Sequence, residues 1–182
     1  MKKKTALWVK ILTPVLIVAV IGGMWIYKTI SEKPADDPTS SESTSDLPSN
    51  LEGADFSLNA TKQIDFAALS EYDLPIIADY GADSCIPCKQ MAPVLKTLNS
   101  EMQGKAFIKF VDVWKYYDAA NNVPIQLIPT QVFFNADGTP YIPSESLKKQ
   151  IGGFKFYNGF TIHEGGLSEE QMRAILKEMG VE

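Results

Sequence analysis

The sequence predicts an α/β fold in which helices flank a mixed central sheet, and three observations support this class. Residues 74–80 form a short apolar run with the length of a buried strand. Apolar residues then recur at helical spacing over 91–102. Strand-like segments follow at 106–113 and 131–135, and an amphipathic helix closes the chain. Strands that alternate with helices in this way are typical of a sheet with helices packed against it.

The shorter elements have local signals of their own. We expect a helical stretch over 64–69 and a short polar helix over 116–121. Asp137-Gly138 predicts a hairpin turn, because tight turns need the positive φ that glycine readily adopts. Residues 142–160 exceed what a hairpin needs, so we expect an extended hairpin or an insertion. Its aromatic residues form either a satellite core or a surface that selects the partner, and the segment could also be a surface elaboration without a role.

The last helix has both of its ends marked. Ser168, with Gln171 three residues later, has the pattern of a capping box, in which the two side chains satisfy backbone N–H groups at the helix start. Gly180 fits the helix stop. Four apolar residues at helical spacing face the core: Met172, Ile175, Leu176 and Met179.

Cys85 and Cys88 are the only cysteines among 182 residues, and two residues separate them. The pair lies between the predicted strand at 74–80 and the helix that follows, which places it at a helix N-terminus. Unpaired backbone N–H groups and the helix dipole stabilise a thiolate at this position. The spacing therefore indicates a redox-active thiol pair that can close a small disulfide.

Two structural interpretations compete with a redox site. A purely stabilising disulfide would be expected between distant segments, because closing so short a loop constrains little of the unfolded chain. A zinc site needs about four ligands, whereas the chain offers two cysteines and the single histidine, His163. We therefore expect no metal and no cofactor. We interpret His163 as a strand residue at a surface or core edge rather than a catalytic group.

Composition and charge divide the chain into three parts. A hydrophobic content of 45% and a net charge of −5 are ordinary for a globular domain, which we assign to residues 51–182. Residues 31–50 are rich in serine, proline and acidic residues and have no aromatic residue, which predicts a disordered linker. The charge pattern indicates no nucleic-acid-binding surface.

Residues 1–30 predict a membrane anchor. Lysines precede an uncharged apolar run from Ile11 to Tyr27, which is just long enough to span a bilayer. Trp25 and Tyr27 suit the membrane interface. Lysines before the span place the N-terminus in the cytoplasm and the domain outside, as a single-pass protein of the cell membrane. The alternative is a signal peptide that is cleaved, which would leave a secreted protein.

Over roughly residues 60–180 the chain resembles the thioredoxin family. The matching features appear in the family's order: a strand, Cys85-Ile86-Pro87-Cys88-Lys89, Met91-Ala92-Pro93, Ile128-Pro129-Thr130, an Asp-Gly turn and a capped last helix. The resemblance implies a thioredoxin-like fold. It also implies that Pro129 follows a cis peptide bond and faces the cysteines. Pro129, Ile128 and Pro87 would then contact an extended substrate.

Thiol–disulfide chemistry assigns the roles of the two cysteines, because Cys85 is nearer the helix start and the more exposed, and the resemblance implies a role for Asp79. Cys85 would be the nucleophile that attacks a substrate disulfide, and Cys88 would resolve the mixed disulfide. Asp79 matches the family's buried acid and would pass a proton to or from Cys88. An apolar strand around Asp79 should raise its pKa by desolvating the charged form.

Three positions depart from the family's pattern. Ser84 and Ile86 flank the first cysteine, where the family usually has tryptophan and glycine. The lysine that commonly lies beside the buried acid is replaced by Phe110. We expect Lys109 to point to the opposite face of its strand.

The sequence therefore predicts an extracytoplasmic thiol–disulfide oxidoreductase that reduces disulfides in envelope or secreted proteins. Secreted proteins meet oxidising surroundings, so a reductase there needs electrons, and we expect an integral-membrane thiol electron carrier as a partner. A disulfide oxidase or isomerase is the alternative within this chemistry. A tethered binding or chaperone module with incidental cysteines is the alternative outside it.

Overall fold

The computed structural model describes residues 48–181, which include the whole region that resembles thioredoxin. The predicted anchor at 1–30 and all but the end of the predicted linker at 31–50 lie outside the described residues. Within the part that is described, none of the helices has both the length and the apolar character needed to cross a bilayer.

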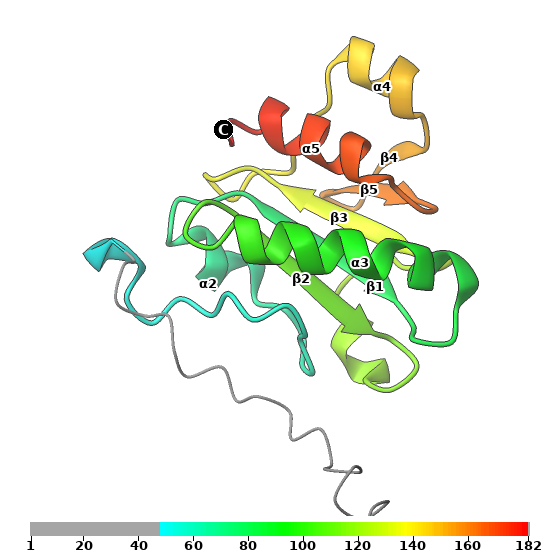
Figure 1. Ribbon diagram of the computed structural model, residues 1–182, viewed down its shortest axis with the longest axis horizontal. Coiled ribbons are helices and arrows are strands. Elements are labelled where there is room, and N and C mark those ends of the chain that lie inside the picture. The colour runs from blue at the N-terminus through cyan, green and yellow to red at the C-terminus, as the bar shows by residue number, and fades with distance from the viewer. Residues whose placement is uncertain (1–47, 182) are drawn as a thin grey trace, which may run out of the picture. The chain divides into compact units, whose positions relative to one another are not determined.

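Five strands and four α-helices make up the described domain (Figure 1). The strands form one sheet in the order β2-β1-β3-β5-β4. β1 and β2 are parallel and the other neighbours are antiparallel, so the sheet is mixed, as predicted. The elements in chain order are η1 (Ser49–Leu51), α2 (Phe66–Ser70), β1 (Ile76–Gly81), α3 (Ile86–Glu101), β2 (Phe107–Asp112), η2 (Tyr117–Ala120), β3 (Thr130–Phe134), α4 (Glu145–Ile151), β4 (Phe154–Tyr157), β5 (Phe160–Glu164) and α5 (Glu169–Glu178).

The inner strand β1 has a hydrophobic core on each of its two faces, so all six of its residues are buried. Ile77 packs in a core built largely from α3 and α5, which lie on one face of the sheet in Figure 1. Ile76 and Ala78 point to a second core, which α2 and η2 help to cover. Strand residues alternate between the faces, so Asp79 falls on the α3 side. The predicted α/β fold, with helices on both faces of a mixed sheet, is thus confirmed.

Most predicted elements are present with small shifts in their bounds. β1 begins two residues later than predicted because Pro75 has no N–H group to donate to a neighbouring strand. The polar helix expected over 116–121 is the 3-10 helix η2. The capping box of Ser168 and Gln171 is present, and Gly180 has a φ of 89° after α5.

The turn predicted at Asp137-Gly138 is present, and a second hairpin follows it further along the chain. Asp137-Gly138 forms a turn in which the N–H of Gly138 donates to the carbonyl of Asn135. Backbone hydrogen bonds from Asn135 to Thr139 and from Tyr141 to Phe133 continue it as a short hairpin. The hairpin partner of β5 is β4, through a turn at Asn158-Gly159 with positive φ at both residues. Asn-Gly is a strong hairpin signal that could have located this turn.

The segment expected as an extended hairpin or an insertion at 142–160 contains the helix α4 and the edge strand β4, which forms a hairpin with β5. Leu147 and Phe154 pack into the core beneath α5, so part of the segment is structural. Phe156 and Tyr157 remain 64% and 50% exposed on β4. The segment therefore contributes side chains to the main core and also carries an exposed aromatic pair.

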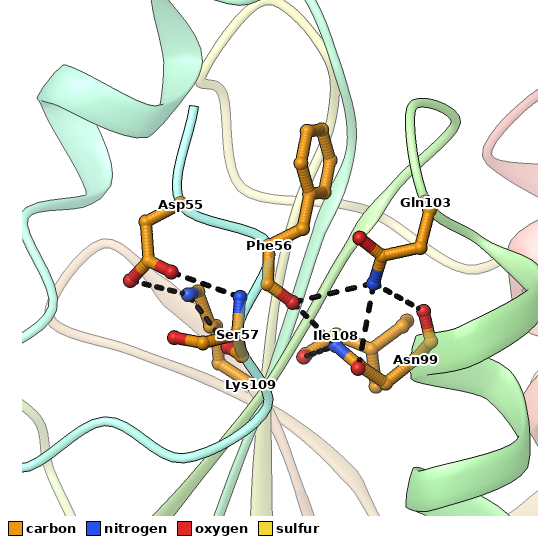
Figure 2. Close-up of polar contacts among 7 residues, drawn as sticks. All are labelled: Asp55, Phe56, Ser57, Asn99, Gln103, Ile108 and Lys109. Carbon is orange, nitrogen blue, oxygen red and sulfur yellow. Dashed lines mark hydrogen bonds and ion pairs between the residues drawn. The ribbon is translucent and has the colours of Figure 1, made fainter. Parts of the chain in front are cut away.

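The extended segment before α2 is tied to β2 and α3 by backbone and side-chain contacts (Figure 2). Asn99 of α3 donates to the carbonyls of Phe56 and Ile108 at 2.8 and 2.9 Å. Lys109 of β2 is buried and donates to Asp55 at 3.0 Å and to the carbonyl of Ser57 at 2.8 Å. Lys109 therefore lies on the face of the sheet opposite Asp79, as predicted.

Candidate active site

The two cysteines form a disulfide at the start of α3, with their Cα atoms 5.2 Å apart. Cys85 is the N-cap, and its sulfur accepts the backbone N–H of Cys88 at 3.3 Å. Pro87 lies in the first turn, where its missing N–H costs nothing. After reduction, the same N–H groups and the helix dipole are placed to stabilise a thiolate on Cys85.

The cysteines differ in their access to solvent. Cys85 is 9% exposed and Cys88 is 3% exposed, so the outer sulfur belongs to Cys85. Ile86, between them, is 74% exposed and presents a large apolar side chain beside the pair. This arrangement fits the predicted roles, in which Cys85 attacks the substrate disulfide and the more buried Cys88 resolves the mixed disulfide.

The loop before β3 brings Ile128 against the cysteines. Ile128 packs on a small cluster formed by Ala82, Cys85 and Cys88. The Ile128–Pro129 peptide bond is cis, as the resemblance implies, and the carbonyl of Pro129 accepts the N–H of Gly165 at 2.9 Å. Pro87 is exposed on the first turn of α3. Contact of these residues with a substrate remains a prediction.

A carboxylate that the sequence analysis did not identify fixes the loop before Cys85. Asp112, at the end of β2, accepts the backbone N–H of Asp83 at 3.0 Å and those of Trp114 and Lys115. Burial raises the pKa of Asp112, but these three N–H groups outweigh it and hold the pKa below the usual value. Lys115 also pairs with the exposed Asp83. These contacts join the carboxyl ends of β1 and β2 next to the disulfide.

Asp79 is fully buried on β1, opposite Phe110 of β2 and Gln131 of β3. Burial raises its pKa from 3.8 to about 7, and the hydrogen bond from Gln131 opposes that rise. Phe110 occupies the position on β2 beside Asp79, and the side chain of Lys109 points to the opposite face of the sheet. Neither β2 residue therefore places an amino group beside the Asp79 carboxyl. The predicted rise in pKa is confirmed.

Gly81 lets the sulfur of Cys88 lie directly on β1. A β-carbon at Gly81 would lie 3.1 Å from the Cys88 sulfur and 3.0 Å from the Phe110 ring, closer than side chains normally approach. Gly81 is two residues beyond Asp79, so the two positions share one face of the strand. Asp79 and Cys88 therefore belong to the same buried strip beneath α3.

Gln131 and His163 extend this strip across the sheet. Gln131 Nε2 donates to Asp79 Oδ1 at 2.7 Å, and Gln131 Oε1 lies 2.8 Å from His163 Nδ1. His163 is 5% exposed, so its placement at a core edge is consistent with the sequence interpretation. The role of Gln131 was missed because nothing in the sequence marks which residue faces Asp79 on β3. In the described residues, no three histidine, cysteine or acidic side chains are grouped to hold a metal.

In this site a buried strand leads to a Cys-x-x-Cys pair at a helix N-terminus, and a cis-proline loop lies beside the pair. This is the arrangement of a thiol–disulfide oxidoreductase. The family model described as Thioredoxin matches residues 58–151. Thioredoxin C-2 of Corynebacterium nephridii is 35% identical over 95 residues, which are 52% of this chain and 82% of that protein. The chain belongs to the thioredoxin family.

Two further similarities have partial coverage. Thioredoxin 1 of Chlorobaculum tepidum is 40% identical over 62 residues, which are 34% of this chain and 61% of that relative. A crystal structure of chloroplastic thioredoxin z has a TM-score of 0.44 and 25% identity, covering 65% of this chain and 93% of that one. Together with the family match, the relatives define this chain as a thioredoxin-family thiol–disulfide oxidoreductase whose Cys85 and Cys88 are in disulfide contact.

Proposed function

We propose that this enzyme works outside the cytoplasm, tethered by residues 1–30, and reduces disulfides in envelope or secreted proteins. The observation that favours reduction over oxidation is the short segment of chain between α3 and β3. Only β2 and the 3-10 helix η2 lie between Glu101 and Thr130, so this part of the chain has no large helical insertion such as disulfide-forming oxidases carry.

The cysteine geometry supports a two-step exchange. The Cys85 thiolate attacks one sulfur of the substrate disulfide, which breaks that bond and releases a substrate thiolate. Asp79 accepts the proton of Cys88, and the new Cys88 thiolate attacks the Cys85 sulfur of the mixed disulfide. The second substrate thiolate leaves, so the substrate gains two electrons and the enzyme ends in the Cys85–Cys88 disulfide. Ile128, Pro129 and Pro87 hold the substrate chain beside Cys85.

A further turnover needs two electrons to reduce the Cys85–Cys88 disulfide. Surroundings outside the cytoplasm are oxidising, so these electrons must come across the membrane, from an integral-membrane thiol carrier. The tether keeps the domain near such a carrier. The twenty residues of 31–50 give a root-mean-square reach of about 25 Å if they behave as a flexible chain.

The proposal predicts that a membrane-impermeant maleimide added to intact cells labels Cys85 and Cys88 of the full-length protein without prior reduction. Labelling requires both that the domain is outside and that the carrier keeps the dithiol reduced. The measurement is the mass shift of the protein on a gel after quenching. The Cys85→Ser/Cys88→Ser variant is the matched control, because it has no other thiol to label.

Each other outcome contradicts one part of the proposal. Labelling only after an impermeant phosphine is added would place the domain outside in an oxidised state, as an oxidase requires. Labelling only after lysis would place the domain in the cytoplasm. Mass spectrometry of the membrane-extracted protein should find an intact N-terminus, whereas a soluble species that begins near Met24 would show a cleaved signal peptide.

A further inference from the structure

Three buried polar side chains lie side by side on three neighbouring strands. Asp79 of β1 pairs in register with Gln131 of β3, and Gln131 pairs with His163 of β5. Directly opposed residues in a sheet point to the same face, so all three lie on the side covered by α3 and α5. The hydrogen bonds of 2.7 and 2.8 Å join them into one chain from His163 to Asp79.

The surroundings of this chain keep water out and hold its middle member in place. Asp79 and Gln131 are 0% exposed and His163 is 5% exposed. The sulfur of Met91, on α3, lies 3.4 Å from Gln131 Nε2. The Phe154 ring packs edge-on to His163 at 5.4 Å, and Gly153 leaves room for the imidazole. In such a site each hydrogen bond is stronger than it would be in water.

The chemistry of the groups fixes the direction of both hydrogen bonds. The charged Asp79 carboxylate only accepts, and the Met91 sulfur is also an acceptor, so the amide NH2 of Gln131 faces both of them. The amide oxygen of Gln131 then faces His163 and only accepts, so His163 must carry its hydrogen on Nδ1. Burial lowers the pKa of His163, against the opposing effects of Glu164 and the Gly165 backbone, so the imidazole is neutral at pH 7.

We infer that His163 is a positioning residue for the redox reaction: it holds the Gln131 amide with its N–H toward Asp79 and so keeps Asp79 able to accept the proton of Cys88. This inference rests on the proposed role of Asp79. The N–H of Gln131 stabilises the charged carboxylate, whereas burial favours the protonated acid. Asp79 Oδ2 makes no hydrogen bond to the described residues, so this oxygen is free to take the proton.

Without the imidazole donor, the amide of Gln131 can rotate and present its oxygen to Asp79. An oxygen in that place accepts a hydrogen bond only from the protonated acid, so Asp79 would keep its proton at neutral pH. The residues around this pair of side chains are neutral: Phe110 lies opposite Asp79 on β2, Met91 of α3 contacts Gln131, and Cys88 lies over Gly81 on the same face of β1. Glu164 is the charged residue that follows His163 in the chain, and its carboxylate forms an ion pair with Lys155 of β4.

The test uses His163→Leu, which removes the donor, and His163→Asn, whose amide N–H can take the place of Nδ1. The full-length reduced proteins are mixed with Ellman's reagent, which gives a Cys85 mixed disulfide and releases one coloured thiolate. Attack by Cys88 then releases a second thiolate, and the rate of this second release is followed from pH 5 to 9. The first release depends on Cys85 and serves as the internal reference.

We expect His163→Leu to move the pH midpoint of the second release upward by about one unit, which makes this step about tenfold slower at low pH. Gln131→Leu should move the midpoint at least as far, and His163→Asn should restore a midpoint close to that of the parent. An unchanged midpoint in a folded His163→Leu protein would overturn the inference. So would an equal shift in the Asp79→Asn background, because the effect would then bypass Asp79.

A second measurement separates this inference from the proposed role of Asp79. The carboxyl carbon of Asp79 can be titrated by NMR in the oxidised full-length protein, where no thiol reacts. We expect its pKa to rise in His163→Leu and not in His163→Asn. If the NMR pKa rises while the second release is unaffected in Asp79→Asn, the proton-accepting role of Asp79 fails and the positioning by His163 stands. An NMR pKa that is unchanged in His163→Leu contradicts the inference directly.

Discussion

Cys85→Ser will abolish disulfide reduction in the insulin assay, by about three orders of magnitude or more, because removal of a nucleophile leaves no alternative attacking group. The chain has no third thiol that could substitute for Cys85. The N-cap position also gives the serine hydroxyl no comparable reactivity, since a helix terminus cannot make it an anion at neutral pH. The measurement is the turbidity of precipitating insulin chains with dithiothreitol as the electron source.

Cys88→Ser is the informative partner of that variant. It keeps the more exposed Cys85 sulfur and removes the group that resolves the mixed disulfide, so enzyme–substrate disulfides should accumulate on non-reducing gels. The double variant Cys85→Ser/Cys88→Ser should show none. If Cys85→Ser retains substantial turnover, or if the trapped species form in that variant instead, the assignment of the nucleophile is wrong.

Asp79→Asn will stabilise the oxidised protein at neutral and alkaline pH. The pKa of Asp79 is about 7 in the folded protein and near 3.8 when unfolded, so the folded state binds the proton more tightly. The free energy of unfolding of the parent therefore falls as pH rises from about 4 to about 7 and then levels off. This charge costs about 4 kcal/mol above pH 7, and Asn at this position removes that cost.

The measurement is urea unfolding of the parent and of Asp79→Asn at a series of pH values, with the disulfide intact in both. The two curves should be closest near pH 4 and separate progressively up to pH 7. The same substitution should slow the second thiolate release from the Ellman adduct, because Cys88 loses its proton acceptor. A stability difference that does not change with pH would mean that Asp79 has no raised pKa.

The sequence was sufficient to predict the parts of the site that are local. Cys85 and Cys88 lie one turn apart, and a run of apolar residues marks the strand before them, so periodicity alone places the pair at a helix start. Asp79 lies in that apolar run, and its role as the buried acid was inferred from the resemblance to the thioredoxin family. The fold class followed from the order of these elements.

Contacts between strands could not be predicted in this way. Gln131 and His163 meet Asp79 only because of the register of β1, β3 and β5, and a shift of one residue would turn each side chain to the other face. Asp112 is identified as a loop anchor only when the parallel pairing of β1 and β2 is known. The helix α4 and the strand β4 within the expected insertion were not predicted, because the Asn158-Gly159 turn that joins β4 to β5 was overlooked.

A dithiol that acts as a reductant has a low redox potential, so the potential of the Cys85–Cys88 pair distinguishes a reductase from an oxidase. The full-length protein is equilibrated with glutathione or thioredoxin buffers of defined ratio, and the fraction of dithiol is measured by alkylation. A reductase should have a potential close to that of thioredoxin, about −270 mV. A potential near −120 mV, as in a strong disulfide-forming oxidase, would contradict the account.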